Sequence, residues 1–373
     1  MPTLADRLKS SQRLHLLIIV AAALALLLPY FLHPQWLIWP NSGLGADVGH
    51  LSWPDLTNMA RALAQGRIPV WDSSIALGHP LVGNLGILWL YPPAALFLVL
   101  PPTLAFSALA ALHLALAGTF TYFLLRDFNA SPVAALAAAL AYMLMPKLVA
   151  HLAATHFGMI YGLAWMPAVL LAAHTRRLWP AALGGLALAM QFPGHPQVPI
   201  GTAYLLMGMI VWQCGQIALS SGWRSAAFRI AVTQWVLAGT VLTVAASLVG
   251  AVWLLPVAEL LPWAAKVQFA SAAPFWYQMP PALLLTLLGP TEFQFPEWVT
   301  YAGIVPLLLA CIALLGPRRR AALYLWSAAA VTLLIALGDA TPVYPLAKTL
   351  VPGLSFFRTS TRLWLYGGFV LAV

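Results

Sequence analysis

Three aspartates in one polar and aromatic stretch, residues 39–92, have the side chains best suited to chemistry. Asp47, Asp55 and Asp72 are three of only nine carboxylates in the 373-residue chain. A carboxylate at a boundary between water and membrane can take a proton from an attacking hydroxyl group, or stabilise a positively charged reaction centre. We therefore expect the chemistry of the protein to lie in this stretch.

Two of these aspartates also have a structural explanation. Asp47 ends the segment GLGAD, which is typical of a helix N-cap that follows a turn. Asp55 follows Trp53 and Pro54 at a predicted helix start, where a carboxylate interacts favourably with the free N–H groups of the first turn. The sequence leaves capping and catalysis open for both residues.

Two arginines near the end of the chain, Arg358 and Arg362, are the best candidates for holding a phosphate group. They are four residues apart in FFRTSTR, so they would share one face if this segment is helical. The fork of a guanidinium group fits phosphate oxygens. The alternative is that both arginines simply flank a helix at the membrane interface.

Three histidines are further candidates for substrate binding. His195 lies between Gly194 and Pro196 in a predicted turn, where it could contact a sugar or a phosphate. His151 and His156 are five residues apart, which does not place them on one helical face, and a metal site needs a third ligand that the sequence does not identify. We expect hydrogen-bonded loop histidines, assign no metal ligand and no cofactor, and leave a need for a divalent cation open.

The elements that must position these residues are membrane helices. The chain is 62% hydrophobic and 7% charged, whereas charged residues make up about a quarter of a soluble protein. Apolar runs recur from end to end, which predicts a single transmembrane domain over 1–373. The net charge of +9 comes from short basic clusters between these runs, a pattern typical of cytoplasmic loops and not of a nucleic-acid-binding patch.

The apolar runs predict an all-α bundle of about ten transmembrane helices with a long first external loop. The last run reaches the end of the sequence, so we expect the chain to be cut within a helix. The predicted helices cover 14–32, 103–125, 131–147, 157–173, 178–192, 199–219, 229–256, 301–316, 321–338 and the residues from 363 onward.

The basic residues predict the orientation of the bundle. The first helix is preceded by a basic segment, which predicts a cytoplasmic N-terminus, a retained helix rather than a signal peptide, and an external loop over 33–102. Four prolines interrupt 85–101, so we expect a re-entrant or interfacial piece there. The predicted inner loops then hold 11 of the 18 Lys and Arg residues: Arg7, Lys9, Arg13, Arg126, Arg176, Arg177, Arg224, Arg229, Arg318, Arg319 and Arg320.

A second external segment, 257–300, is rich in proline and aromatic residues. It is too interrupted for an ordinary helix. We expect it to lie along the interface and guide a lipid chain, or to cover the helix bundle.

Several segments together resemble the YfhO-like bacterial membrane proteins, which belong to the GT-C superfamily of polytopic glycosyltransferases. The similar segments occur in order over nearly the whole chain. They are GADVGHLSWPDLTNMARALAQGRIPVWDSSIALGHPLVGN, LYPPAALFLVLP, the pair His151 and His156 ahead of AWMP, GHPQ, YAGIVPLLLA and LVPGLSFFRTSTRLWL.

The resemblance implies an enzyme of the bacterial inner membrane that takes a sugar from a polyprenyl-phosphate carrier and passes it to a cell-envelope acceptor on the outer face. It implies an essential acidic residue in the first external loop, at the position of Asp47, with Asp55 as the second candidate. Asp72 departs from the family pattern, because Trp71, Asp72 and Ser73 stand where members commonly have Trp-Asn-Pro. Family members are often longer, so acceptor-binding parts could lie outside this sequence.

Two other functional classes remain as alternatives. A lipid or polysaccharide transporter is expected to show ionisable groups in the middle of its helices, and these are scarce here. A structural membrane subunit would bind protein partners and have no transfer activity. The varied polar residues of the predicted outer face favour an enzyme that works there.

Overall fold

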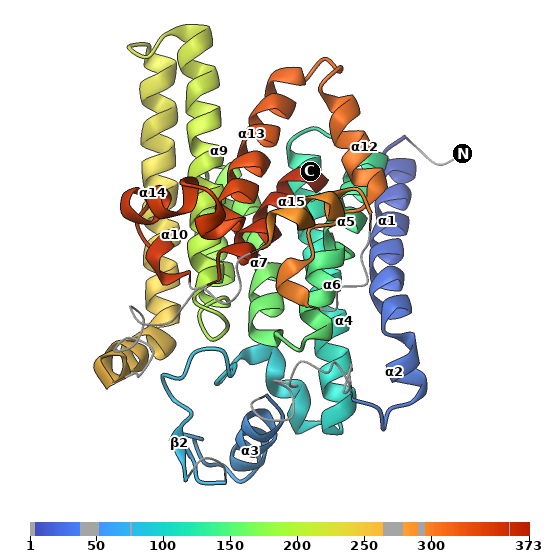
Figure 1. Ribbon diagram of the computed structural model, residues 1–373, viewed down its shortest axis with the longest axis vertical. Helices are drawn as coiled ribbons and strands as arrows, with labels where there is room; N and C mark the ends of the chain where they lie inside the picture. Colours follow the sequence, from blue (N-terminus) through green and yellow to red (C-terminus); the bar gives the residue numbers. More distant parts are fainter. Residues whose placement is uncertain (1–3, 38–51, 75–76, 264–278, 290–294, 358) are drawn as a thin grey trace.

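The computed structural model describes residues 4–37, 52–74, 77–263, 279–289, 295–357 and 359–373 (Figure 1). Within these ranges the protein is α-helical, which confirms the predicted all-α class. The strands of the described residues are β1 (Trp71–Asp72) and β2 (His79–Pro80), which pair antiparallel with Asp72 opposite His79. Asp47 and Arg358 lie outside the described residues.

The helices follow the apolar runs of the sequence closely. The α-helices are α1 (Leu4–Leu26), α2 (Leu28–Leu32), α3 (Trp53–Ala64), α4 (Pro102–Asp127), α5 (Pro132–Met143), α6 (Pro146–Ala153), α7 (Phe157–His174), α8 (Leu178–Ala189), α9 (Gln197–Ser221), α10 (Ala226–Leu260), α12 (Ile304–Ala313), α13 (Arg319–Ala336), α14 (Val343–Leu350) and α15 (Trp364–Ala372). Short 3₁₀ helices join them: η2 (Pro92–Leu98), η3 (Leu261–Trp263), η4 (Pro281–Leu287), η5 (Pro296–Trp298), η6 (Gly338–Ala340), η7 (Leu354–Phe356) and η8 (Ser360–Leu363).

Six helical segments in the described part of the chain are long and apolar enough to cross a membrane. Their length and composition are compatible with a multi-pass α-helical membrane protein, while ten crossings stays a prediction. The six segments are Pro102–Asp127, Pro132–Ala153, Phe157–His174, Gln197–Ser221, Ala226–Trp263 and Arg319–Ala336. Shorter apolar helices cover Ser11–Leu26, Leu178–Ala189 and Ile304–Ala313.

Residues 85–101 contain no α-helix. Their longest element is η2, with seven residues. A 3₁₀ helix of that size is about 14 Å long, whereas a membrane core is about 30 Å thick. This stretch is too short to cross as a helix.

Small residues let the helices pack closely around α7, most of whose residues are buried. Gly184 of α8 illustrates this, because a Cβ atom there would lie 2.7 Å from the Cβ atom of Ala172 in α7. Close backbone approach at small residues is the usual packing device of membrane helices. At the ends, the hydroxyl groups of Ser131 and Ser225 accept hydrogen bonds from the first turns of α5 and α10.

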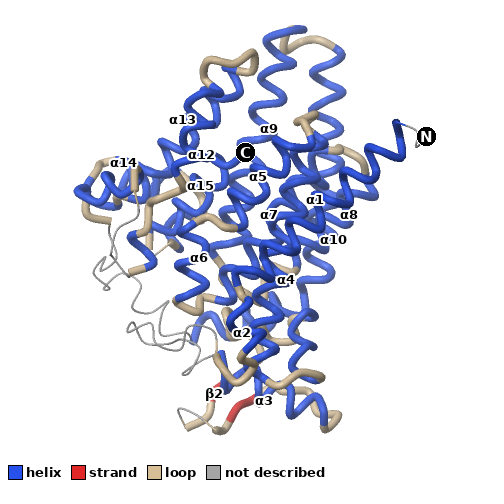
Figure 2. Tube along the Cα trace, turned by 90° about the vertical axis from the view of Figure 1, so that its right-hand side faces the viewer, coloured by secondary structure: helices blue, strands red, loops and turns tan. Residues whose placement is uncertain are grey.

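The chemical character of the two ends of the bundle differs. The start of α1, the α9–α10 connection and the α12–α13 connection lie at one end, whereas α3 and the β1–β2 hairpin lie at the other (Figures 1 and 2). The first end carries arginine-rich connections such as 318–320, and the second carries Asp55 on α3 and Asp72 on β1. Arginines gathered in the connections at one end are a pattern expected of a membrane protein.

Two predicted helices are broken in the structure. The predicted helix 14–32 is divided at Leu27 into α1 and α2, with Pro29 near the start of α2. The predicted helix 131–147 ends at Met143, and α6 begins at Pro146, since proline cannot continue a helix but fits its first turn. The expectation of a loop around His151 was therefore wrong, because this residue lies on α6.

Candidate functional site

Ionisable side chains from four separate parts of the chain meet inside the protein. They come from α6 and the turn after it, the turn before α9, η5 and η8. We call this group the ionic centre; it consists of Lys147, His151, His156, His195, Glu297 and Arg362.

The strongest contact of the ionic centre joins Glu297 and Arg362. The Nε and Nη2 atoms of Arg362 each lie 2.7 Å from Oε1 of Glu297, and Nη1 lies 2.9 Å from Nε2 of His195. Thr361 donates its hydroxyl group to Oε2 of Glu297 at 3.2 Å. Both oxygens of this buried carboxylate are therefore held by the segment 361–362.

Lys147 contributes a second positive charge beside the same residue. Its ammonium group donates to the backbone carbonyls of Glu297 at 2.8 Å and of Pro296 at 3.4 Å. Lys147 is 1% exposed and Glu297 is 3% exposed. A buried charge is costly unless it is paired and hydrogen-bonded, so these contacts tie α6 to η5.

A strained turn brings His151 and His156 together. Thr155 has a φ angle of 62°, a left-handed conformation that is unusual for a β-branched residue. The turn folds the chain back, so that the backbone N–H of His156 donates to the carbonyl of His151 at 3.0 Å. As a result the Nδ1 atoms of the two rings lie 2.8 Å apart, although a spacing of five does not place them on one helical face.

His195 is positioned by a close approach of two backbone segments. A Cβ atom on Gly194 would collide with the carbonyl oxygen of Gly158, so only glycine allows this turn to lie against the start of α7. The N–H of His195 donates to that carbonyl at 3.4 Å. In the same turn, the carbonyl of Pro193 accepts hydrogen bonds from the N–H groups of Gly86 and Leu88, so residues 86–88 pack against the turn that carries His195.

Aromatic side chains fix the remaining segments. The indole N–H of Trp364 donates to the carbonyl of Thr300 at 2.7 Å, which holds the segment after η5 against α15. The hydroxyl group of Tyr366 donates to the carbonyl of Gln197 at 3.1 Å, which holds the start of α9 against the same helix. Helix α15 therefore anchors two of the segments that supply the ionic centre.

Positive charge dominates the electrostatics of the ionic centre. Burial raises the pKa of Glu297, but Arg362 and Lys147 outweigh that effect and hold the pKa below its usual 4.5. The carboxylate is therefore ionised and balances one of its two cationic neighbours. A surplus of positive charge in a buried position favours the binding of an anion.

A second polar group lies on α3 and the β1–β2 hairpin. We call it the outer-loop cluster; it consists of Asp55, Asn58, Asp72, Ser74 and His79. Asp55 accepts a hydrogen bond from the Nε2 atom of His79 at 3.0 Å, and Asp72 accepts from Asn58 at 2.7 Å. The backbone N–H and the hydroxyl group of Ser74 donate to the other oxygen of Asp72 at 2.8 and 2.6 Å.

The two aspartates of this cluster differ in their pKa. Burial raises the pKa of Asp55 above 3.8, and the attraction of His79 lowers it only in part. Burial also acts on Asp72, but the hydrogen bonds from Ser74 and Asn58 outweigh it and lower the pKa below 3.8. Oδ2 of Asp55 and Nδ1 of His79 are buried without a hydrogen-bond partner in the described part of the chain.

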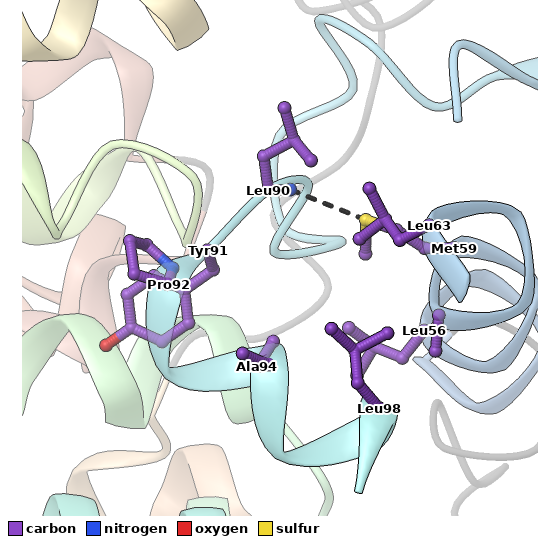
Figure 3. Close-up of a pocket in the computed structure, with 10 residues that line it drawn as sticks. Leu56, Met59, Leu63, Leu90, Tyr91, Pro92, Ala94 and Leu98 are labelled. Carbon is purple, nitrogen blue, oxygen red and sulfur yellow. Dashed lines mark hydrogen bonds between the residues drawn. The ribbon is translucent and has the colours of Figure 1, made fainter. Parts of the chain in front are cut away.

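An apolar pocket of about 140 Å³ lies beside the outer-loop cluster, between α3 and η2 (Figure 3). Leu56, next to Asp55 in the sequence, lines it together with Met59 and Leu63 from the same face of α3. Figure 3 shows Leu98 and Ala94 of η2 on the opposite wall. The lining is apolar, and Asp55 itself does not belong to it.

The structure brings together part of the predicted site. His151, His156, His195 and Arg362 belong to the ionic centre, whereas Asp55 belongs to the outer-loop cluster. The sequence offered a shared face for Arg358 and Arg362 only if FFRTSTR is helical. In the described residues the 3₁₀ helices η7 and η8 are separated by Phe357 and Thr359, which are extended, so no single helix covers the segment.

Sequence reasoning missed Glu297 and Lys147. Glu297 lies between a proline and a tryptophan in an interrupted segment, and Lys147 lies at the end of an apolar run. The only sequence feature that could have identified them is that charged residues are rare in this chain and costly inside a membrane protein.

Capping does not account for Asp55. It lies in the first turn of α3, as predicted, but the hydrogen bond of its carboxylate goes to His79, and the N-cap residue Ser52 makes no side-chain capping bond. The carboxylate of Asp55 therefore pairs with the imidazole of His79 instead of capping α3.

Comparison with known proteins assigns no function to the chain, so the geometry of the ionic centre and the outer-loop cluster is the basis for a proposal. No protein-family model matches the chain, and no curated protein matches it.

Proposed function

We propose that the chain is a YfhO-like membrane glycosyltransferase with a GT-C bundle of ten crossings. In this proposal it transfers a sugar from a polyprenyl-phosphate carrier to a cell-envelope acceptor on the outer face of the bacterial inner membrane, with its N-terminus in the cytoplasm. The observation that carries the proposal is Arg362, a guanidinium group held in place at the edge of a buried and cationic centre.

Arg362 has the properties that a phosphate-binding residue needs. Its contacts to Glu297 and His195 fix the plane of the guanidinium group, and 18% of its side chain is exposed. These three close contacts use three of five N–H donors, so the group can also donate to an oxygen of a ligand. Lys147 adds positive charge nearby, and a guanidinium fork that is already oriented binds phosphate with little loss of side-chain freedom.

The long loop supplies the base in this proposal. The hydroxyl group of the acceptor attacks the anomeric carbon of the sugar, a new carbon–oxygen bond forms, and the bond from that carbon to the carrier phosphate breaks. Asp47 takes the proton of the acceptor hydroxyl, and the carrier leaves as polyprenyl phosphate. Asp55 is the second candidate for the base, and the apolar pocket between α3 and η2 suits an isoprenoid part of the donor.

The proposal is tested by sugar transfer in proteoliposomes that contain the purified protein, a polyprenyl-phosphate sugar and an acceptor. The variant Asp47→Asn should lose roughly 10² to 10⁴ in transfer rate, because a positioned base contributes about that factor. Arg362→Lys should raise the KM for the donor, because an ammonium group cannot make the forked contact. The control Arg318→Lys, in the α12–α13 connection, should transfer at the rate of the unmodified protein.

Three outcomes would count against the proposal. Full transfer by Asp47→Asn would remove that residue from the mechanism. Movement of the lipid-linked sugar across the vesicle membrane without any covalent change would indicate a transporter instead. Isolation in a fixed ratio with other chains, again without transfer, would indicate a structural subunit.

A further inference from the structure

One imidazole nitrogen of the ionic centre has no role in the contacts described so far. Nε2 of His151 is buried and has no hydrogen-bond partner among the described residues. The side chain of His151 is fully buried, and this nitrogen lies 3.7 Å from Oε2 of Glu297. An unpaired buried polar atom is destabilising, and most such atoms in proteins have a partner, so this nitrogen calls for a ligand.

His156 and Glu297, together with His151, form a group of three side chains that can bind a metal ion. One donor atom from each of His151, His156 and Glu297 lies within 4.8 Å of the other two. A tetrahedral zinc ion with bonds of about 2.0–2.2 Å holds its ligand atoms roughly 3.3–3.6 Å apart. The three side chains therefore need to move together by about 1 Å, which small side-chain rotations provide.

We propose that His151, His156 and Glu297 bind a zinc ion and leave a fourth position for water or an anion. Two imidazoles and one carboxylate with an open position form the ligand set of many catalytic zinc sites. Mg²⁺ and Ca²⁺ prefer oxygen ligands alone, so the two histidines select a transition metal. This site goes beyond the proposed glycosyl transfer and does not depend on it.

The surroundings of Glu297 fit the role of a metal ligand. Oε1 is held by Arg362 at 2.7 Å, and the hydroxyl group of Thr361 contacts Oε2 at 3.2 Å. Such outer contacts orient a ligating carboxylate, and their loss typically weakens metal binding by about 10–100-fold. Oε2 is the oxygen nearest His151, so it is the atom available to the metal.

The charges of the ionic centre determine what fills the fourth position. Lys147 and Arg362 repel a divalent cation, so a single carboxylate does not neutralise the occupied site. An anionic fourth ligand restores the balance. We expect hydroxide or a phosphate oxygen at that position, because both bind zinc and both are attracted by the same two cations.

The test measures metal in the full-length protein purified in detergent without chelators. Elemental analysis should find about one zinc ion per chain, and each of His151→Ala, His156→Ala and Glu297→Gln should lose it. The matched control is His174→Ala. His174 is also buried in part, but it contacts Gln213 and Asp127, away from the ionic centre, and this variant should keep its zinc.

A second measurement keeps the inference testable if a variant fails to fold. Unmodified protein that has been stripped with a chelator and then titrated with Co²⁺ should develop the visible absorption of a tetrahedral site with a nitrogen and oxygen ligand set, and excess Zn²⁺ should abolish it. Thr361→Val should weaken Co²⁺ binding by about 10–100-fold.

Absence of bound zinc together with absence of the Co²⁺ bands would overturn the inference, as would zinc retained in all three ligand variants. Binding of inorganic phosphate by metal-free protein, with no response to Zn²⁺, would show that the cluster is an anion site only.

Discussion

The outer-loop cluster and the ionic centre are both buried arrangements of carboxylate and imidazole groups, but the chain builds them in different ways. Asp55 and His79 are 24 residues apart and belong to one helix and one hairpin. Arg362 and its partner His195 are 167 residues apart, and α6 and η5 must also be in place. The first group can form locally, whereas the second can form only when most of the bundle has assembled.

The two groups also differ in how far their charges are removed from water. The side chain of His79 is 21% exposed, so the outer-loop cluster keeps contact with solvent on one side. The side chains of Lys147 and His151 have almost no exposed area, and Glu297 is 4% exposed. Removal of one member of an ion pair that is buried away from water leaves the other charge uncompensated. Substitutions in the ionic centre should therefore destabilise the protein more than substitutions in the outer-loop cluster.

The largest effect is expected for Glu297→Gln. The substitution leaves Arg362 and Lys147 without their carboxylate, and removal of one member of a buried ion pair costs about 3–5 kcal/mol. We expect a loss of this size in the free energy of unfolding, measured by denaturant titration in detergent.

The double variant Glu297→Leu with Arg362→Leu provides the control for this loss. It removes both charges, so it should cost less than the sum of the two single variants, because neither partner is left alone. Equal losses in the double variant and in that sum would show that the two residues do not interact.

A smaller effect is expected for Asp55→Ala in the outer-loop cluster. The loss of a hydrogen bond to a charged group costs roughly 1.5–3 kcal/mol, and the partly exposed His79 can still be solvated. The same unfolding measurement should therefore show less destabilisation than for Glu297→Gln. If Asp55→Ala were the more damaging change, exposure would not be what distinguishes the two groups.

The different construction of the two groups explains what the sequence could predict. Apolar runs and prolines predicted most helices to within a few residues, because a membrane helix is a local and strongly patterned element. Asp55 was a candidate because it lies in the one polar stretch after the first apolar run. Its partner His79 lies in the same stretch, so a local search reaches both.

The ionic centre could not be predicted in the same way. The contact between His151 and His156 depends on the left-handed conformation of Thr155, which residue type disfavours and which tertiary packing imposes. Glu297 joins this pair only through the three-dimensional arrangement of η5 and η8, and no spacing in the sequence encodes that arrangement. A charged residue in an apolar chain is a signal of function, but it does not name its partners.

The smallest effect is expected at Asp72, and its size depends on pH. Because the hydrogen bonds from Ser74 and Asn58 lower the pKa of Asp72 below 3.8, the unfolded chain takes up the proton more readily than the folded protein. Asp72 therefore stabilises the fold above pH 3.8, and this contribution is lost as the pH falls through the lower pKa of the folded state.

Asp72→Asn should accordingly cost about 1 kcal/mol at neutral pH, and the difference from the unmodified protein should shrink as the pH falls below 3.8. Unfolding curves of the two proteins at neutral and acidic pH measure this difference. Arg67→Gln makes a matched control, because Arg67 lies in the same loop and contacts Gln65 rather than the cluster. A difference between Asp72→Asn and the unmodified protein that persists unchanged in acid would mean that Asp72 acts through packing and not through its charge.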